Sequence, residues 1–242
     1  MTKRTQTLQA LAALLIATGL AGSAQAAVIT YDFEGQTKGD LDTAGWLFGT
    51  ADGVDWKVDA DPDDEANDVL RQDNGGIGNG GSGKLGAFAI APDNITGSVD
   101  FSVDVRLDED GTNDDAAVIF GWQDPDNYLF FLLNDTEFTD LFQVSNGNQS
   151  TLVDLGAPGV ATAQWHSVEI VHDPDTSSAI VALNGTELYN GTDAAFATAG
   201  KIGMGNLNDA GSFDNLEIVP EPGTLALLGI GGLGVLLRRR QG

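Results

Sequence analysis

The sequence predicts an all-β fold, an antiparallel sandwich of strands that forms a single domain. Apolar residues recur with a period of two, most clearly in residues 98–107, where Val99, Phe101, Val103 and Val105 alternate with polar residues. Short runs of this kind are separated by Asp, Asn, Gly and Pro, and no segment between the two chain ends keeps a helical stripe over ten residues. Because no helices are available to cover a parallel sheet, antiparallel sheets must pack on each other.

Each further predicted strand is an apolar run that ends at turn residues. In chain order these runs are residues 116–122, 128–133, 141–144, 165–171 and 179–183. Two connections, residues 123–127 and 172–176, contain Asp-Pro-Asp and have the composition of hairpin turns, since Asp, Pro and Asn stabilise tight turns. The pattern therefore predicts hairpins between neighbouring strands.

The predicted domain, residues 27–219, is strongly acidic. Its length suits one sizeable domain and is too short for two. It holds six Lys and Arg against 35 Asp and Glu, so it should repel nucleic acid and anionic lipid and attract cations, calcium in particular. The alternative is that the acidic surface keeps an exported protein soluble. The absence of cysteine excludes a disulfide framework, thiol catalysis and cysteine zinc sites.

The first 26 residues have the layout of a cleavable signal peptide that forms a helix. Lys3 and Arg4 precede the apolar residues 8–20, and the small-residue pattern Ala24-Gln25-Ala26 follows. The sequence thus predicts export through the secretion machinery, with cleavage after Ala26.

The last residues, 220–242, form a second targeting segment. Pro220-Glu221-Pro222 precedes the apolar residues 224–237 and the cluster Arg238-Arg239-Arg240. As a helix the apolar run would reach roughly 21 Å, less than the ~30 Å hydrocarbon core, so it is a marginal transmembrane helix. The arginines would hold its end in the cytoplasm.

This tail resembles the PEP-CTERM sorting signal of Gram-negative bacteria in its motif Val219-Pro220-Glu221-Pro222, its glycine-rich apolar helix and its terminal arginine cluster. The resemblance implies recognition by an exosortase, a membrane cysteine protease. The protease would remove the tail, and the protein would pass to the cell surface or to an extracellular exopolysaccharide matrix. The alternative is a plain membrane anchor, for which so short a helix is poorly suited.

The domain resembles the concanavalin A-like, laminin-G-like jelly roll of many exported bacterial proteins. The residues that carry this resemblance are 31–35, 120–128, 165–166, 183–185, 200–203 and 213–216. Jelly rolls of this kind include lectins, carbohydrate-binding modules, adhesion domains and glycosidases, so the fold alone leaves the function open.

The resemblance also implies a structural calcium site. In similar jelly rolls the first and last strands lie side by side and hold the ion through an acidic residue and backbone carbonyls; the matching positions here are Glu34 and Asp214. The alternative is that both side chains only cap strand ends. Acidic residues 59–68 and 108–115 also offer oxygens, but the second stretch lacks the ligand order of an EF-hand.

The sequence predicts no catalytic site. Retaining glycosidases of this fold place Glu-x-Asp-x-x-Glu along one strand, and this pattern is absent. His166 shares the parity of Val168 and Ile170 and is expected in the core, whereas His172 lies at a turn and is expected in solvent. Residues 76–81 fit G-x-G-x-x-G, but they neither follow a strand nor open a helix, so a surface loop is expected.

Sugar binding requires exposed aromatic rings beside polar groups. Trp56, between Asp55 and Lys57, is the predicted ring, while Trp122 and Trp165 are expected in the core. The sequence therefore predicts an exported, exosortase-processed protein with a non-catalytic jelly-roll module that binds polysaccharide or acts in adhesion. The alternatives are a glycoside-active enzyme with an unfamiliar acid pair and a purely structural matrix protein.

Overall fold

The computed structural model describes residues 27–50, 56–72, 84–108, 114–136, 139–207 and 209–221, and one compact unit spans Val28–Pro220. The predicted signal peptide with Ala24 and Ala26 lies outside these residues, as do Pro222 and the arginine cluster 238–240. Among the described residues, no helix is both long and apolar enough to span a membrane.

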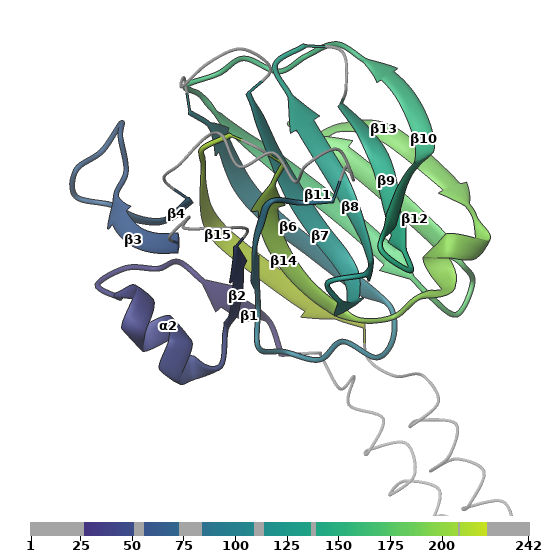
Figure 1. Ribbon diagram of the computed structural model, residues 1–242, viewed down its shortest axis with the longest axis horizontal. Helices are drawn as coiled ribbons and strands as arrows, with labels where there is room; N and C mark the ends of the chain where they lie inside the picture. Colours follow the sequence, from purple (N-terminus) through teal and green to yellow (C-terminus); the bar gives the residue numbers. More distant parts are fainter. Residues whose placement is uncertain are drawn as a thin grey trace, which may run out of the picture. The chain divides into compact units, whose positions relative to one another are not determined.

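Two antiparallel sheets form the domain (Figure 1). The first sheet has the order β13 (Thr186–Thr192), β12 (Ser178–Leu183), β11 (Trp165–Asp173), β6 (Val99–Leu107), β15 (Gly211–Pro220), β4 (Asp68–Gln72) and β3 (Trp56–Ala60), and β1 (Ile29–Tyr31) also pairs with β15. The second sheet has the order β10 (Asn148–Ala157), β9 (Thr139–Ser145), β8 (Asn127–Asn134), β7 (Asp115–Asp124), β14 (Lys201–Asn206), β5 (Ala87–Ile90) and β2 (Leu47–Thr50). The predicted all-β antiparallel sandwich is confirmed.

The predicted strands and hairpins occur where the sequence pattern places them. Residues 98–107 become β6, whose core-facing side chains at Val99, Phe101, Val103, Val105 and Leu107 are at most 2% exposed. Residues 123–127 form the turn between β7 and β8, and residues 172–176 lie at the turn between β11 and β12. Alternation along each strand thus fixed which side chains enter the core.

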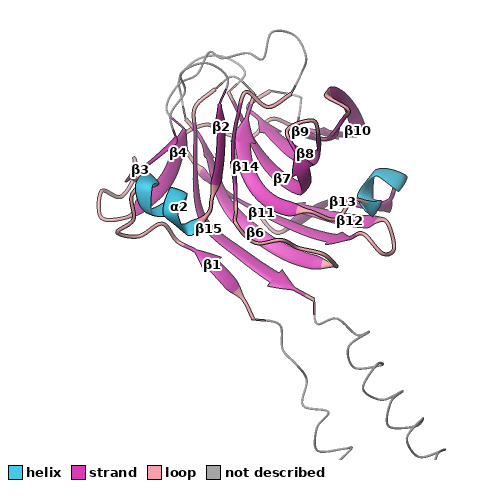
Figure 2. Ribbon diagram, turned by 60° about the horizontal axis from the view of Figure 1, so that its bottom comes forward, coloured by secondary structure: helices cyan, strands magenta, loops and turns pink. Residues whose placement is uncertain are grey.

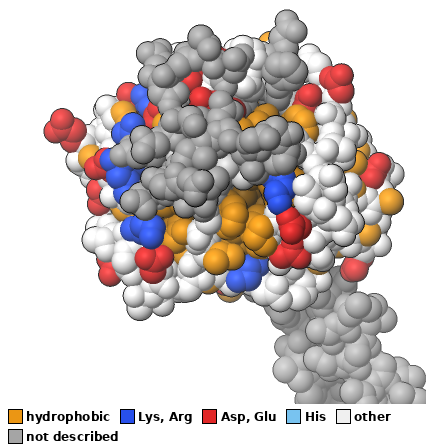
Figure 3. All heavy atoms as spheres, viewed as in Figure 1, with side chains coloured by type: hydrophobic (Ala, Val, Ile, Leu, Met, Phe, Trp, Pro, Cys, Tyr) orange, Lys and Arg blue, Asp and Glu red, His pale blue; other side chains and the backbone are white. Residues whose placement is uncertain are grey.

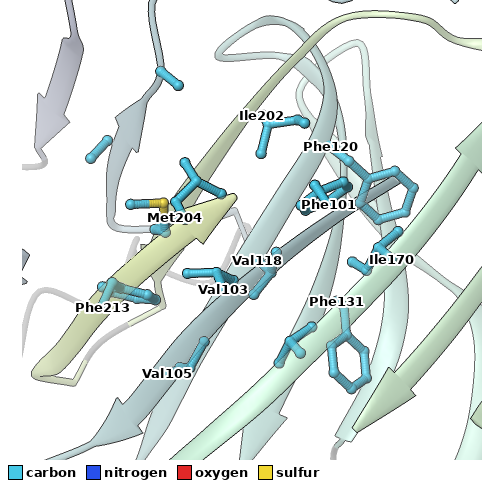
Figure 4. Close-up of a cluster of buried hydrophobic side chains, with 14 of the residues drawn as sticks. Phe101, Val103, Val105, Val118, Phe120, Phe131, Ile170, Ile202, Met204 and Phe213 are labelled. Carbon is cyan, nitrogen blue, oxygen red and sulfur yellow. The ribbon is translucent and has the colours of Figure 1, made fainter. Parts of the chain in front are cut away.

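The core lies between the two sheets (Figure 4). The first sheet contributes Phe101, Ile170 and Phe213, and the second contributes Phe120 and Phe131. All five side chains are at most 1% exposed. This packing between sheets removes the apolar side chains of both inner faces from water and is the main source of stability in a sandwich.

Two short helices connect strands (Figure 2). Helix α2 (Lys38–Ala44) begins with a capping box, in which Thr37 accepts from the backbone of Asp40 and Asp40 accepts from the backbone of Thr37. It ends at Gly45, whose φ of 95° is left-handed and suits glycine. The second helix, η1 (Ala194–Ala197), buries Phe196 against the core.

Candidate functional site

The first and last strands of the sandwich lie side by side. β1 pairs with β15 in the register Ile29 with Ile218, Thr30 with Glu217 and Tyr31 with Leu216. The residues expected to bind calcium flank this pair, since Glu34 follows β1 and Asp214 lies within β15. The strand neighbourhood implied by the family resemblance is therefore present.

Asp214 is a buried carboxylate, 4% exposed, with amide partners. It accepts hydrogen bonds from the backbone nitrogen of Asn215 at 2.7 Å and from Nδ2 of Asn67 at 3.1 Å. Burial raises the pKa of Asp214, these two hydrogen bonds lower it, and the negative charges of Asp104 and Glu34 raise it again, with a net rise. The carboxylate of Glu34 accepts from the backbone nitrogen of Asp68 at 3.2 Å.

This arrangement fits calcium in its chemistry but supplies few carboxylates. Within the described part of the chain, no three His, Asp or Glu side chains are grouped so that they could hold a metal ion. Calcium takes about six to eight oxygens and accepts backbone and amide carbonyls as well as carboxylates. Glu34 and Asp214 could thus supply only part of a coordination shell, and backbone and amide oxygens would have to complete it.

The other predicted acidic stretches are engaged in local structure. In residues 59–68, Asp61 accepts from the backbone nitrogen of Asp63 at 2.8 Å, and Asp64 accepts from that of Ala66 at 3.1 Å. At the start of residues 108–115, Asp108 is buried between Arg106 and Arg71, with the Arg71 contact at 3.1 Å. Residues 109–113 lie outside the described chain. The described carboxylates named here stabilise turns or neutralise arginines.

Trp56 is not the exposed ring that the sequence predicted. Its side chain is 1% exposed and packs in the core, with ring centroids 5.9 Å from Phe213 and 6.2 Å from Phe48. As the first residue of β3 it points between the sheets, while its neighbour Lys57 points outward and pairs with Asp59. The prediction of Trp56 as a sugar platform is therefore wrong.

His172 is also placed differently from the prediction. It is 2% exposed, not solvated, and its Nε2 lies 2.8 Å from the carbonyl oxygen of Phe196. Burial lowers the pKa of His172, which outweighs the opposite effects of the Phe196 hydrogen bond and of Asp173. The ring is therefore neutral near pH 7, and Nε2 carries the proton that it donates to Phe196.

His166 is buried as predicted, 7% exposed. Its Nδ1 lies 3.1 Å from Nδ2 of Asn184, and its Nε2 lies 2.8 Å from the carbonyl oxygen of Ala161. Because the amide nitrogen can only donate, Nδ1 accepts and Nε2 donates. Both ring nitrogens are thus occupied by structural hydrogen bonds that join the loop before β11 to the β12–β13 hairpin.

The outer side of the second sheet carries a row of aromatic side chains, which we call the ring face. Its members are Phe88 on β5, Trp122 on β7, Tyr128 and Phe130 on β8, and Phe142 on β9. Successive ring centroids along the row are 4.5, 5.0, 5.8 and 5.1 Å apart, within the range of favourable aromatic pairs. In Figure 3 hydrophobic side chains gather over this sheet, and charged side chains lie around them.

The ring face is separate from the core. Along β8, Leu129 and Phe131 point between the sheets, and the alternating Tyr128 and Phe130 point to the opposite side. The side chains of Trp122 and Tyr128 are each 3% exposed, whereas the side chain of Phe88 is partly exposed. The row therefore opens to solvent at Phe88 and is enclosed farther along.

Polar groups lie beside the rings near the β7–β8 turn. Lys84 forms an ion pair with the exposed Asp126, and Nδ2 of Asn127 donates to Asp124 at 2.9 Å. The Tyr128 hydroxyl accepts from the backbone nitrogen of Leu85 at 3.1 Å. Burial raises the pKa of Tyr128 to about 12, so the hydroxyl keeps its proton at neutral pH. Rings and hydrogen-bonding groups are thus adjacent, as recognition of a sugar requires.

Sequence reasoning missed the ring face because it treated the rings of β7 and β8 as members of one core. Residues 116–122 and 128–133 are apolar at almost every position, a pattern typical of strands buried on both sides. Trp122 is buried as expected, but on the side away from the core. Trp165, also expected in the core, is half-buried on the outer side of the first sheet and pairs across strands with Arg106.

The C-terminal sorting signal is confirmed by comparison with protein families. Residues 219–240 match the model of the PEP-CTERM protein-sorting motif. This match includes Pro220, Glu221, Pro222 and the three arginines at 238–240. No curated protein matches the chain.

Solved structures similar to this chain confirm the jelly-roll sandwich. The carbohydrate-binding module CBM66 from Bacillus subtilis has a TM-score of 0.55 at 12% identity, covering 72% of this chain and 95% of its own. Cellulose induced protein, Cip1, has a TM-score of 0.55 at 18% identity, with 79% and 97% covered. Domain 4 of AbnA, an extracellular arabinanase from Geobacillus stearothermophilus solved with arabinotriose, has a TM-score of 0.51 at 16% identity, with 81% and 93% covered.

Proposed function

We propose that this protein is exported, processed by an exosortase, and carries a non-catalytic module that binds polysaccharide at the cell surface or in the extracellular matrix. The observation that carries the proposal is the open end of the ring face, where the partly exposed Phe88 continues the row of buried rings that leads to the polar β7–β8 turn. The sorting motif supports the destination. The likeness to a carbohydrate-binding module, and to a domain solved with arabinotriose, supports the ligand class.

The open end of the ring face suits a sugar ring. A pyranose or furanose presents apolar C–H groups on its face and hydroxyl groups at its edge. Phe88, which is partly exposed and lies 4.5 Å from the buried ring of Trp122, offers an apolar surface for the face. Asp124, Asp126 and Asn127 lie at the adjoining turn and offer partners for the hydroxyl groups.

The same residues support binding without catalysis. Glycoside hydrolysis needs two carboxyl groups held on opposite sides of the scissile bond, one of them as an acid. Asp124 accepts hydrogen bonds from Asn127 and from the backbone of Asp126, and Asp126 is neutralised by Lys84. Both aspartates lie in one exposed turn, an arrangement suited to hydrogen bonding with hydroxyl groups and not to clamping a glycosidic bond.

A structural calcium ion near β1 and β15 is the second part of the proposal. Glu34 and Asp214 would hold it, and its role would be to stabilise the strand pair. The concentration of negative charge around Asp214 supports this assignment, because Asp104 and Glu34 both act on its carboxyl group. The ion would neutralise that charge.

Binding is tested with purified residues 27–221 on a panel of bacterial and plant polysaccharides. We expect selective binding that weakens about tenfold in Phe88→Ala, the loss of one well-packed ring contact. Trp165→Ala is the matched control, because it removes a partly exposed aromatic ring from the outer side of the other sheet and should leave affinity unchanged.

Three results would contradict the proposal. Folded protein that binds no polysaccharide would exclude a glycan-binding role and favour a structural one. Loss of binding in Trp165→Ala but not in Phe88→Ala would indicate that the binding site lies on the first sheet. Release of reducing sugar that disappears on replacement of a carboxylate would identify an enzyme.

A further inference from the structure

The sorting motif begins inside the folded domain. The matched motif starts at Val219, while β15 continues to Pro220. Val219 lies opposite Asp100, and Pro220 lies opposite Val99, both on β6. The domain and the sorting motif therefore share two residues, and no spacer separates them.

β15 is an interior strand, and its release from the sandwich would cost backbone pairing and buried contacts. β6 lies along one side of it, while β4 and β1 pair with its other side at Gly211–Phe213 and at Leu216–Ile218. Phe213, Leu216 and Ile218 are each 0% exposed. Withdrawing β15 as far as Leu216 would break pairing on both sides and open the core, whereas Val219 and Pro220 pair with β6 alone.

A protease needs the chain in an extended form and free to pair with its own active site, so a bond inside a sheet is protected until that strand opens. Beyond Pro220 this protection ends. Proline has no backbone N–H to extend the pairing, and Glu221 is exposed and outside regular secondary structure. The Pro220–Glu221 bond is the first one downstream of the paired residues.

We propose that the folded sandwich sets the upstream limit of processing, so that the membrane protease cuts at the Pro220–Glu221 bond or downstream of it. The inference rests on the proposed exosortase processing. In hydrolysis, water gives its hydroxyl to the carbonyl carbon of the upstream residue and a proton to the nitrogen of the downstream residue. Transfer to an amine would replace the hydroxyl with that amine and leave the same last residue.

The released protein then keeps the whole of β15. The N-terminal and C-terminal strands of the released protein lie side by side. Ile29 pairs with Ile218, so the start of β1 is next to the end of β15. Cleavage after Ala26, as the sequence predicts, would leave two residues, Ala27 and Val28, before Ile29. Both processing events would therefore act at one end of the β1–β15 pair without disturbing its pairing.

The position of the cut is tested on the full chain, expressed in a Gram-negative host whose exosortase processes another PEP-CTERM protein. Mass spectrometry of the released protein should identify Pro220 or a later residue as the last one. A last residue at Val219 or upstream would overturn the limit. An intact tail, recognised by the mass of the unprocessed chain, would refute the processing and the inference together.

A spacer variant tests whether the sandwich sets the upstream limit of processing. Gly-Ser-Gly-Ser inserted between Ile218 and Val219 keeps the motif intact and frees it from β6. Released chains that end at Val219 or within the spacer should then appear, identified by mass spectrometry. The matched control carries the same spacer after Asn184, in the β12–β13 hairpin, and should keep the limit of the unmodified chain at Pro220. A spacer variant whose released chains still all end at Pro220 or later would overturn the proposal.

Discussion

At the scale of single residues, two buried ionisable groups respond to pH in opposite directions. His172 has a lowered pKa because burial disfavours its cation, and Asp214 has a raised pKa because burial and neighbouring carboxylates disfavour its anion. Acid therefore destabilises the fold through His172 and relieves an unfavourable charge through Asp214. Each residue can be tested by a variant that keeps its shape and removes its titration.

His172 should make the protein less stable in mild acid. Its contribution is fully present above the unfolded value of 6.5 and is lost as pH falls below it, because the unfolded chain binds a proton that the folded chain does not. We expect the loss between pH ~7.5 and pH ~5 to be smaller in His172→Gln by about 1 kcal/mol. Urea unfolding at both pH values measures this difference, and equal pH dependence in the two proteins would contradict it.

Asp214 should report on the proposed calcium site. Asp214→Asn removes a buried negative charge beside Asp104 and Glu34 and keeps an oxygen for the backbone N–H of Asn215, but its amide nitrogen replaces the oxygen that accepts from Asn67. Without calcium, we expect the stability of the variant to lie within about 1 kcal/mol of that of the unmodified protein at neutral pH, because loss of the buried charge and loss of the Asn67 hydrogen bond oppose each other. With calcium, the unmodified protein should gain stability and the variant should gain much less.

Thermal unfolding in millimolar calcium and in chelator checks both statements about Asp214. Asp175→Asn, an exposed aspartate at the β11–β12 turn, is the control for general loss of charge and should retain the response to calcium. An equal shift of the melting temperature in Asp214→Asn and in the unmodified protein would exclude this carboxylate as a ligand.

At the scale of elements, β14 shows how the ring face and the core share one sheet. Ile202 and Met204 point into the core, so Gly203 and Gly205 lie on the side of the ring face. A Cβ at Gly203 would lie 2.4 Å from the carbonyl oxygen of Ala89 and 2.6 Å from Cδ1 of Ile90. Glycine thus allows β5 and β14 to approach closely beneath the aromatic row.

Gly203→Ala should therefore destabilise the domain, by about 1 to 3 kcal/mol, because a methyl group would force β5 away. Gly97→Ala is the matched control, since a Cβ there meets no atom within 4 Å, and its effect should stay within about 0.5 kcal/mol. Urea unfolding compares both variants with the unmodified protein. A Gly203→Ala variant as stable as the control would show that the strands can adjust at no cost.

At the scale of the whole molecule, the sandwich presents an acidic surface with few accessible cations. Five of the six basic side chains of residues 27–219 take part in ion pairs, and two of these, Arg71 and Arg106, share the buried Asp108. The pairing leaves little positive charge to attract an anionic polymer. From this charge distribution we expect weak binding to nucleic acid.

The sequence by itself determined the all-β class, the positions of most strands, the Asp-Pro-Asp hairpins and the sorting motif. These features are local, because period-two alternation, turn chemistry and a linear motif each depend only on consecutive residues. β6 and the β7–β8 turn occur at the predicted residues for this reason. The candidate carboxylates Glu34 and Asp214 could be named because family resemblance matched them to the first and last strands.

Only the tertiary structure decided which faces are covered and which strands become neighbours. Alternation separates Trp56 from Lys57, but it does not say which of the two points into the core. The burial of His172 depends on the distant Phe196, and the ring face depends on the order of β5, β7, β8 and β9 in one sheet. The overlap of the sorting motif with β15 likewise appears only when β6 and β1 enclose that strand, because pairing between distant segments is set by the packing of the whole domain.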